Sequence, residues 1–197
     1  MRKEIVIAAY DRDYSWINDI DPSVKITVYR KGSPDESKPY EIFLENNVGR
    51  DVHTFFKHIV DKYDTLAEFT FFSQDDPFDH VSNLVDMVNG DHALWTQEAM
   101  AWLGECWFFD TNYRHLLVCD EFGGPHHPGL RLLETWQKIF DHPMPNPIHF
   151  VAAGHFCISR TQIHRKPKSF YERIVKVLEE DPESPWCIER FEVFIFT

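Results

Sequence analysis

The chain has 197 residues, a length for which one domain is the usual arrangement, and 43% of them are hydrophobic, enough for a continuous core. The formal charge of −12 argues against a nucleic-acid partner, because phosphate backbones bind basic surfaces. No apolar stretch reaches the length of a membrane span, so we expect a soluble, cytoplasmic, single-domain protein over residues 1–197. Four widely spaced cysteines without a C-x-x-C pair predict buried, reduced thiols.

The first half of the chain reads as strands around one helix. Apolar or β-branched runs predict strands at residues 5–9, 24–29, 40–44 and 69–72. Between the last two strands, residues 50–63 have the apolar spacing of an amphipathic helix that starts after a turn at Gly49.

The second half is richer in helices. Helical patterns cover residues 81–88, 93–103, 130–140, 167–179 and 185–196, the last with a helix-strand segment as the alternative. Residues 148–152 and 155–159 are strand-like on either side of Gly154. Strands that alternate with helices predict an α/β sandwich with a mainly parallel sheet.

Two adjacent carboxylates follow the predicted strand at residues 69–72. In open α/β sheets ligands bind beyond the carboxyl ends of the strands, where Asp75 and Asp76 stand. Neighbouring carboxylates repel unless a cation lies between them, and hard oxygen ligands suit Mg²⁺ or Mn²⁺, which then bridges to substrate phosphates. The alternative is a surface turn, which aspartate also favours.

The segment at residues 47–51 is a second signal. Gly49 permits a tight turn before the helix, whose free N–H groups form an anion site. Arg50 adds a planar fork for a phosphate or a nucleobase edge. The alternative is a turn with an N-cap, in which Arg50 pairs with Asp51 or Glu45.

Five motifs, in order, resemble a group of glycosyltransferase-like domains over nearly the whole chain. The motifs are IVIAAYD at 5–11 with Ser15-Trp16, NVGRD-x-HT at 47–54, QDDPFDH at 74–80, G-x-F-x-ISR at 154–160 with P-x-x-FY at 167–171, and SPW-x-IER at 184–190. The chain looks closest to the glycosyltransferase domain that large chlorella viruses encode to decorate their capsid protein. The resemblance implies the GT-A fold, a nucleotide-binding α/β sandwich with a central, mainly parallel (mixed) sheet. It also implies Mn²⁺, with Mg²⁺ as the alternative, a UDP-sugar donor and a glycan or glycoprotein acceptor. For a viral protein the location would be the host cytoplasm.

The resemblance also assigns roles to individual residues. The end of the first strand would cradle the base through Ala8, Ala9 and Tyr10, with Asp11 or Arg12 near the uracil. The triplet Gln74-Asp75-Asp76 matches the Asp-x-Asp motif of GT-A enzymes, but an amide replaces its first carboxylate. Asp76 then becomes the best metal ligand, Asp75 meets the ribose or sugar hydroxyls, and His155 fits a late metal-binding histidine.

Glu189 and Asp79 are the carboxylates considered as the catalytic base. Glu189 lies in an apolar run, where a carboxylate needs a partner such as Arg190 or acts at an active site. From the resemblance we expect metal-dependent transfer of a sugar from a UDP-sugar to an acceptor hydroxyl. The alternatives are a metal-dependent sugar-nucleotide hydrolase and a non-catalytic domain that binds nucleotide or glycan.

Overall fold

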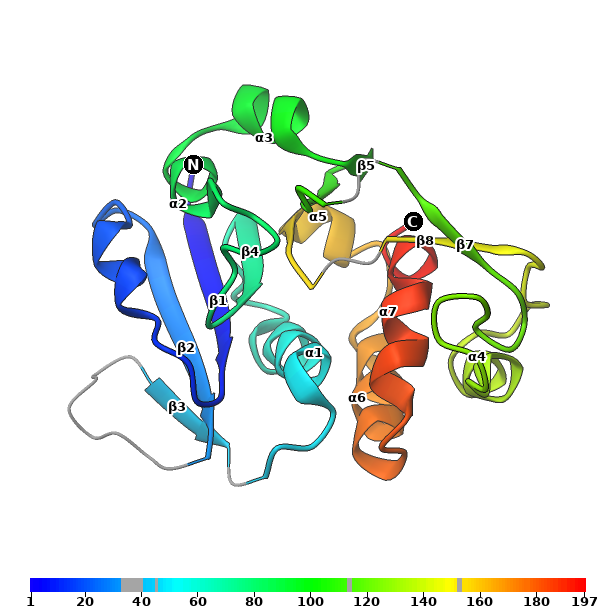
Figure 1. Cartoon of the computed structure of the whole chain (residues 1–197). Coiled ribbons are helices and arrows are strands. Elements are labelled where there is room, and N and C mark those ends of the chain that lie inside the picture. Colours follow the sequence, from blue (N-terminus) through cyan, green and yellow to red (C-terminus); the bar gives the residue numbers. More distant parts are fainter. Residues whose placement is uncertain (33–40, 45, 113–114, 152–153) are drawn as a thin grey trace.

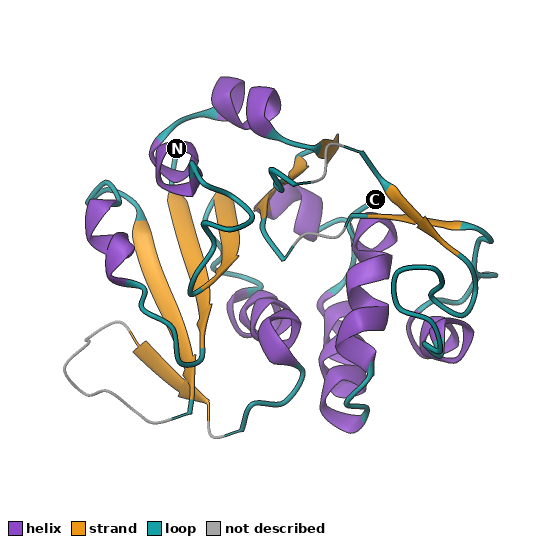
Figure 2. Ribbon diagram, viewed as in Figure 1, coloured by secondary structure: helices purple, strands orange, loops and turns teal. Residues whose placement is uncertain are grey.

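A computed structural model describes residues 1–32, 41–44, 46–112, 115–151 and 154–197 of the chain. The fold is α/β, with a mixed seven-stranded sheet and helices on both of its faces (Figure 1, Figure 2). The strands are β1 (Lys3–Ala9), β2 (Lys25–Lys31), β3 (Glu41–Leu44), β4 (Phe69–Gln74), β5 (Ala101–Leu103), β6 (Cys106–Phe108), β7 (Leu117–Cys119), β8 (Ile148–Phe150) and β9 (Phe156–Ser159). The helices are η1 (Ser15–Asp19, a 3₁₀-helix), α1 (Arg50–Lys62), α2 (Leu84–Asn89), α3 (His92–Glu98), α4 (Leu132–Ile139), α5 (Arg160–Ile163), α6 (Lys168–Glu180) and α7 (Ser184–Ile195).

The strand order of the large sheet is β3-β2-β1-β4-β9-β6-β5. The first four strands in this order are parallel, and the last three join by antiparallel pairing. From β1 the chain moves outward to β2 and β3, crosses over through α1, and returns on the other side of β1 as β4. The strand order therefore reverses between β1 and β4, and α/β sheets bind ligands beyond the carboxyl ends of strands at such a point.

The sheet separates two hydrophobic clusters, as expected when parallel strands are buried on both faces. Ile5 and Ile7 of β1 pack into the cluster that includes η1, α2 and Trp95 of α3. Val6, between them, packs into the cluster formed with α1, α4, α6 and α7. This alternation follows from the period of two in a strand and holds β1 rigidly in the centre of the molecule.

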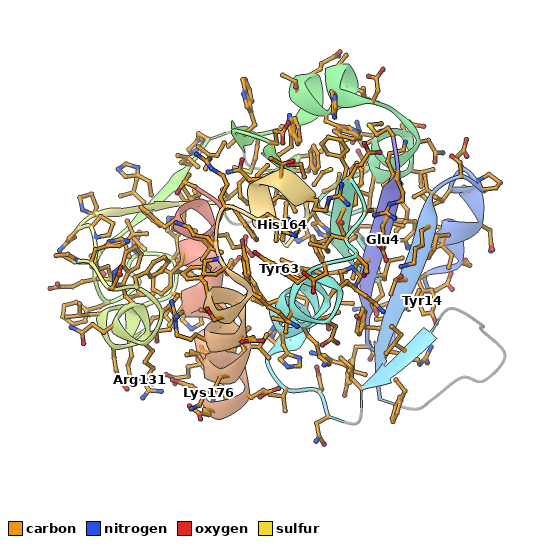
Figure 3. The ribbon with its side chains drawn as sticks, turned by 180° about the vertical axis from the view of Figure 1, so that it is seen from behind. Glu4, Tyr14, Tyr63, Arg131, His164 and Lys176 are labelled. Carbon is orange, nitrogen blue, oxygen red and sulfur yellow. The ribbon has the colours of Figure 1, made fainter. Side chains whose placement is uncertain are left out.

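Helix α1 is fixed to the sheet by its aromatic face. Phe55 lies 5.3 Å from Phe72 of β4 and 5.9 Å from Phe156 of β9, measured between ring centroids. At the far end of the helix, the ring of Tyr63 lies 4.5 Å from that of His164, just after α5 (Figure 3). Anchored at both places, α1 presents its N-terminus to the carboxyl edge of the sheet.

The small β7–β8 sheet and helix α4 lie on the other side of α7 from α1 (Figure 1). Arg131, just before α4, donates to both carboxylate oxygens of Asp181 at the end of α6, at 2.9 and 2.8 Å (Figure 3). Both bonds come from the Nη2 atom of Arg131, and the ion pair links the start of α4 to the end of α6.

The sequence predictions hold for most elements and fail for one. The predicted α/β sandwich is confirmed, and the four cysteines are free and buried. The single helix predicted at 93–103 is wrong, because α3 ends at Glu98 and residues 101–103 form β5. Gly104, at φ 58°, turns the chain so that Trp102 pairs with Trp107. Residues 40 and 152, at the ends of two predicted strands, lie outside the described residues.

Within the part of the chain that the structure describes, no helix is long and apolar enough to cross a membrane.

Candidate functional site

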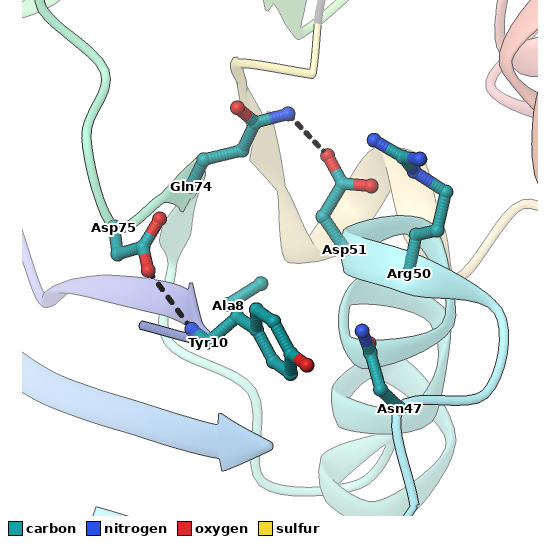
Figure 4. Close-up of a pocket in the computed structure, with 7 residues that line it drawn as sticks. All are labelled: Ala8, Tyr10, Asn47, Arg50, Asp51, Gln74 and Asp75. Atoms are coloured by element: carbon teal, nitrogen blue, oxygen red, sulfur yellow. Dashed lines mark hydrogen bonds between the residues drawn. The ribbon is translucent and has the colours of Figure 1, made fainter. Parts of the chain in front are cut away.

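A cavity of about 310 Å³ opens at the carboxyl ends of β1 and β4, beside the N-terminus of α1 (Figure 4). We call it the sheet-edge cavity. Its volume is at the lower end of the range for small-molecule sites. Its described lining comes from three segments and comprises Ala8, Tyr10, Asn47, Arg50, Asp51, Gln74 and Asp75. In the sheet, Ala8 lies directly opposite Gln74, so the cavity straddles the point where the strand order reverses.

The turn into α1 has an unusual backbone. Gly49 and Arg50 both have positive φ angles, of 64° and 54°. A Cβ atom on residue 49 would lie 2.6 Å from Cβ of His53, so only glycine fits. Arg50 is the only non-glycine residue with positive φ among the described residues. Such a conformation costs free energy and is concentrated at functional sites.

Two interactions hold this turn from either side. The buried Lys31 ammonium donates to the carbonyl of Val48 at 2.8 Å and to that of Arg50. Burial lowers the pKa of Lys31 to about 8, so the ammonium is still mostly protonated at neutral pH. The Arg50 guanidinium lies 5.3 Å from the centre of the Trp186 ring on α7. The turn therefore places a cation at the mouth of the cavity.

Asp51 links the start of α1 to the end of β4. Its carboxylate accepts a 2.6 Å hydrogen bond from the Gln74 amide, drawn as a dashed line in Figure 4. A negative charge in the first turn of a helix is favourable, because the free N–H groups there carry positive partial charge. Gly154 packs closely against this pair. A Cβ atom at residue 154 would lie 3.0 Å from Oδ2 of Asp51 and 3.0 Å from Nε2 of Gln74. Arg50 and Asp51, which the sequence offers as a surface pair, form no ion pair in the structure, and Glu45, the other predicted partner of Arg50, lies outside the described residues.

Asp75 positions the loop after β1. One of its carboxylate oxygens accepts from the backbone N–H of Tyr10 at 2.9 Å and of Arg12 at 3.1 Å, and the other accepts from Asp76 at 3.1 Å. Its own carbonyl accepts from the Trp16 indole at 2.7 Å. The residue is only 8% exposed. With both oxygens occupied by backbone donors, this carboxylate fits a structural role better than that of an open metal ligand.

Three of the predicted metal and catalytic residues, Asp76, Asp79 and His155, lie outside the described lining of the sheet-edge cavity. Asp76 and Asp79 are exposed. His155 is 1% exposed, and its Nδ1 lies 3.2 Å from the Ser73 hydroxyl. Burial, and then the nearby His80, lower the pKa of His155 to about 3, so its ring is neutral. Its Nε2 has no hydrogen-bond partner among the described residues, but the side chain is buried and does not belong to the described lining of either the first cavity or the one that adjoins it.

A second cavity of about 110 Å³ adjoins the first and shares Arg50, Asp51 and Gln74 with it. We call it the acidic cavity, because Glu189 and Glu192 of α7 also line it. Its other lining residues are Val52, Gly154, Pro185 and Trp186.

The two glutamates are both shifted toward the protonated form. Burial raises the pKa of Glu189, although Arg190 at 3.1 Å opposes the shift. Burial raises the pKa of Glu192 well above its ordinary value, and the charges of Glu189 and Asp51 raise it further. Shifted carboxyl groups in a cavity are typical of functional sites.

Of the residues predicted to bind nucleotide, the sheet-edge cavity brings together Ala8, Tyr10, Arg50, Gln74 and Asp75. Ala9 is buried. Arg12 contacts this site through its backbone N–H, which donates to the Asp75 carboxylate.

Among the lining residues with carboxyl or amide side chains, three were not predicted as ligand-binding residues: Asn47, Asp51 and Glu192. The first two belong to the 47–51 segment already singled out. Glu192 could have been found as the residue one helical turn after Glu189.

A protein-family model described as "Protein of unknown function (DUF3431)" matches residues 5–197. A search of curated proteins found no match.

Proposed function

The chain belongs to the DUF3431 family, and from the geometry of its site we propose that it is a glycosyltransferase that uses a nucleoside-diphosphate sugar. UDP is the nucleotide that the resemblance to GT-A enzymes implies. The observation that carries the proposal is the position of the sheet-edge cavity, between β1 and β4 and against the N-terminus of α1. The free N–H groups of that helix and the Arg50 guanidinium are suitable donors for a diphosphate.

The charges of the sheet-edge cavity support a role for a divalent cation. Asp51 and Asp75 line it together with a single guanidinium, that of Arg50. A diphosphate placed here needs more positive charge than the described lining supplies, and bound cations commonly provide it at acidic sites.

Asp76 is the residue that fits such a cation. The described residues contain no group of three His, Cys, Asp or Glu side chains able to hold a metal ion. Mg²⁺ in nucleotide sites, however, is typically held by one or two carboxylates together with substrate phosphates. The exposed Asp76 carboxylate at the end of β4 meets this requirement, whereas Asp75 and His155 do not. Bound Mn²⁺ or Mg²⁺ would neutralise charge on the departing diphosphate.

Glu189 is the proposed general base. Its side chain is 27% exposed in the acidic cavity, and burial raises its pKa toward the range in which a carboxylate accepts a proton efficiently. It would take the proton of the acceptor hydroxyl as the new bond to the sugar forms and the bond to the diphosphate breaks. The proposed acceptor is a hydroxyl of a glycan or glycoprotein.

The first experiment is calorimetry of UDP binding with Mn²⁺ and with a chelator. We expect binding that weakens in the chelator, and an Asp76→Asn variant that binds UDP equally with and without Mn²⁺. Asp79→Asn is the matched control, because Asp79 is exposed as Asp76 is, but lies five residues beyond the end of β4 rather than two. Equal UDP affinity with and without the chelator would refute the role of the cation. Absence of UDP binding would refute the assignment of the cavity to a nucleotide.

Turnover is tested with a panel of UDP-sugars and acceptors. Transfer to an acceptor supports the proposal, and Glu189→Gln should lower its rate while leaving UDP affinity unchanged. Free sugar at every acceptor concentration would instead indicate a hydrolase. Binding without any turnover would indicate a non-catalytic domain.

A further inference from the structure

Glu192 is a buried acid that the proposed mechanism does not use. It is 1% exposed on α7, and its Oε2 has no hydrogen-bond partner among the described residues. Burying a polar atom without a partner costs free energy, and folded proteins keep few such atoms. Glu192 lines the acidic cavity, so a molecule in that cavity can give its carboxyl group a partner that the described residues do not supply.

The size of the acidic cavity limits what enters it. Its volume of about 110 Å³ is about a third of the 310 Å³ of the sheet-edge cavity. A cavity of this size favours one small group over a ligand of several rings. The cavity also adjoins the sheet-edge cavity through three shared residues, so a single ligand could extend from one to the other.

The charge of the cavity decides between ligand classes. Asp51 and Glu189 outnumber Arg50, the one basic residue of its described lining, so the lining repels an anion even without a charge on Glu192. A cation is also disfavoured, because the Arg50 guanidinium already occupies the position over the Trp186 ring. A hydroxyl group both donates and accepts, and therefore matches carboxyl groups in either protonation state.

We propose that the acidic cavity is a subsite for one neutral sugar ring, held through its hydroxyl groups by Glu192 and Glu189, and that it rejects sugars that carry a carboxylate. This inference rests on the proposed function for the place of the ring beside a nucleotide. Binding of the sugar itself follows from the cavity alone.

The first test follows the indole N–H resonance of Trp186 by NMR as methyl glycosides are added. The panel contains neutral glycosides of glucose, galactose, mannose and N-acetylglucosamine, with the glucuronide as the charged counterpart. At least one neutral glycoside should shift the resonance saturably, while the glucuronide should not. Trp186→Phe assigns the signal. Failure of every neutral glycoside, or an equal response to the glucuronide, would overturn the inference.

Variants of Glu192 separate its polar role from its packing. Glu192→Met removes both oxygens in a side chain of similar length and should weaken glycoside binding about tenfold, whereas Glu192→Gln, which still donates and accepts, should stay within about twofold. Glu172→Gln, on the exposed face of α6, is the matched control and should bind as the parent chain does. Equal binding by the Met variant would overturn the role of Glu192.

A parallel titration with UDP and Mn²⁺ distinguishes the two proposals. Glycoside binding without UDP binding would refute the nucleotide-dependent function and leave the sugar subsite standing. UDP binding without any glycoside response would do the reverse.

Discussion

Replacing Asp75 by asparagine should destabilise the fold by about 3 kcal/mol, because three backbone N–H groups depend on its two oxygens. An asparagine has one acceptor oxygen. If that oxygen keeps Tyr10 and Arg12, the N–H of Asp76 loses its partner, and the two remaining bonds become neutral. A hydrogen bond to a charged group contributes about 1.5–3 kcal/mol and a neutral one about 1 kcal/mol, so one bond lost and two weakened give the stated cost.

Urea unfolding at neutral pH measures this difference. For a chain of this size, about 3 kcal/mol corresponds to a fall of about 6–12 °C in the melting temperature. Asp76→Asn is the matched control, since Asp76 is exposed and should change stability by less than about 0.5 kcal/mol. If Asp75→Asn were as stable as this control, the carboxylate would not be holding the loop, and its hydrogen bonds to Tyr10 and Arg12 would not contribute to the free energy of unfolding.

Three further substitutions test the turn and the acidic cavity. Arg50→Gly should change the free energy of unfolding by less than about 1 kcal/mol, because relief of strain at a φ of 54° offsets the lost Trp186 contact and the greater freedom of the unfolded chain. It should also weaken UDP binding. A loss of more than about 2 kcal/mol in urea would contradict the strain. Gly49→Ala should destabilise by about 2 kcal/mol or more through the contact with His53, which a melting curve would reveal. Because the folded state holds a proton on Glu192 that the unfolded chain releases, stability should fall as pH rises above the ordinary glutamate pKa, by at most about 1.4 kcal/mol per pH unit. Glu192→Gln removes this loss. The free energy of unfolding of the variant, measured in urea, should therefore rise relative to that of the parent chain between about pH 5 and pH 7. A difference that stays constant with pH would mean that Glu192 is ionised in the folded state.

The long elements could be predicted from sequence because burial leaves a clear pattern. A strand such as β1 is covered on both faces and shows as a continuous apolar run, and α1 shows its apolar side at helical spacing. The three-residue strands β5, β6 and β7 are too short to establish a period. The apolar spacing around residues 101–103 therefore predicts a helix, whereas their pairing with β6 makes them a strand.

The ends of the strands predict where a cavity lies, but not the contacts that each residue makes there. Asp75 and Asp76 are neighbours in sequence and look equivalent there. What separates them is the approach of backbone N–H groups from residues 10 and 12, more than 60 positions away. Likewise, only the packing of α7 shows that Glu192 is buried beside Asp51 rather than exposed. Such distinctions depend on tertiary contacts and leave no local pattern.

The two proposals together place the reacting bond. If the sheet-edge cavity holds a nucleoside diphosphate and the acidic cavity a sugar, the bond between them must cross the residues that both cavities share, Arg50, Asp51 and Gln74. The hydrogen bond from Gln74 to Asp51 fixes this boundary, and the strained turn at Arg50 places a guanidinium beside it. A fixed positive charge there stabilises negative charge that develops on the departing oxygen. On this argument the strain at Arg50 is retained because the residue serves both cavities, so Arg50→Gly should lower turnover more than it lowers UDP affinity.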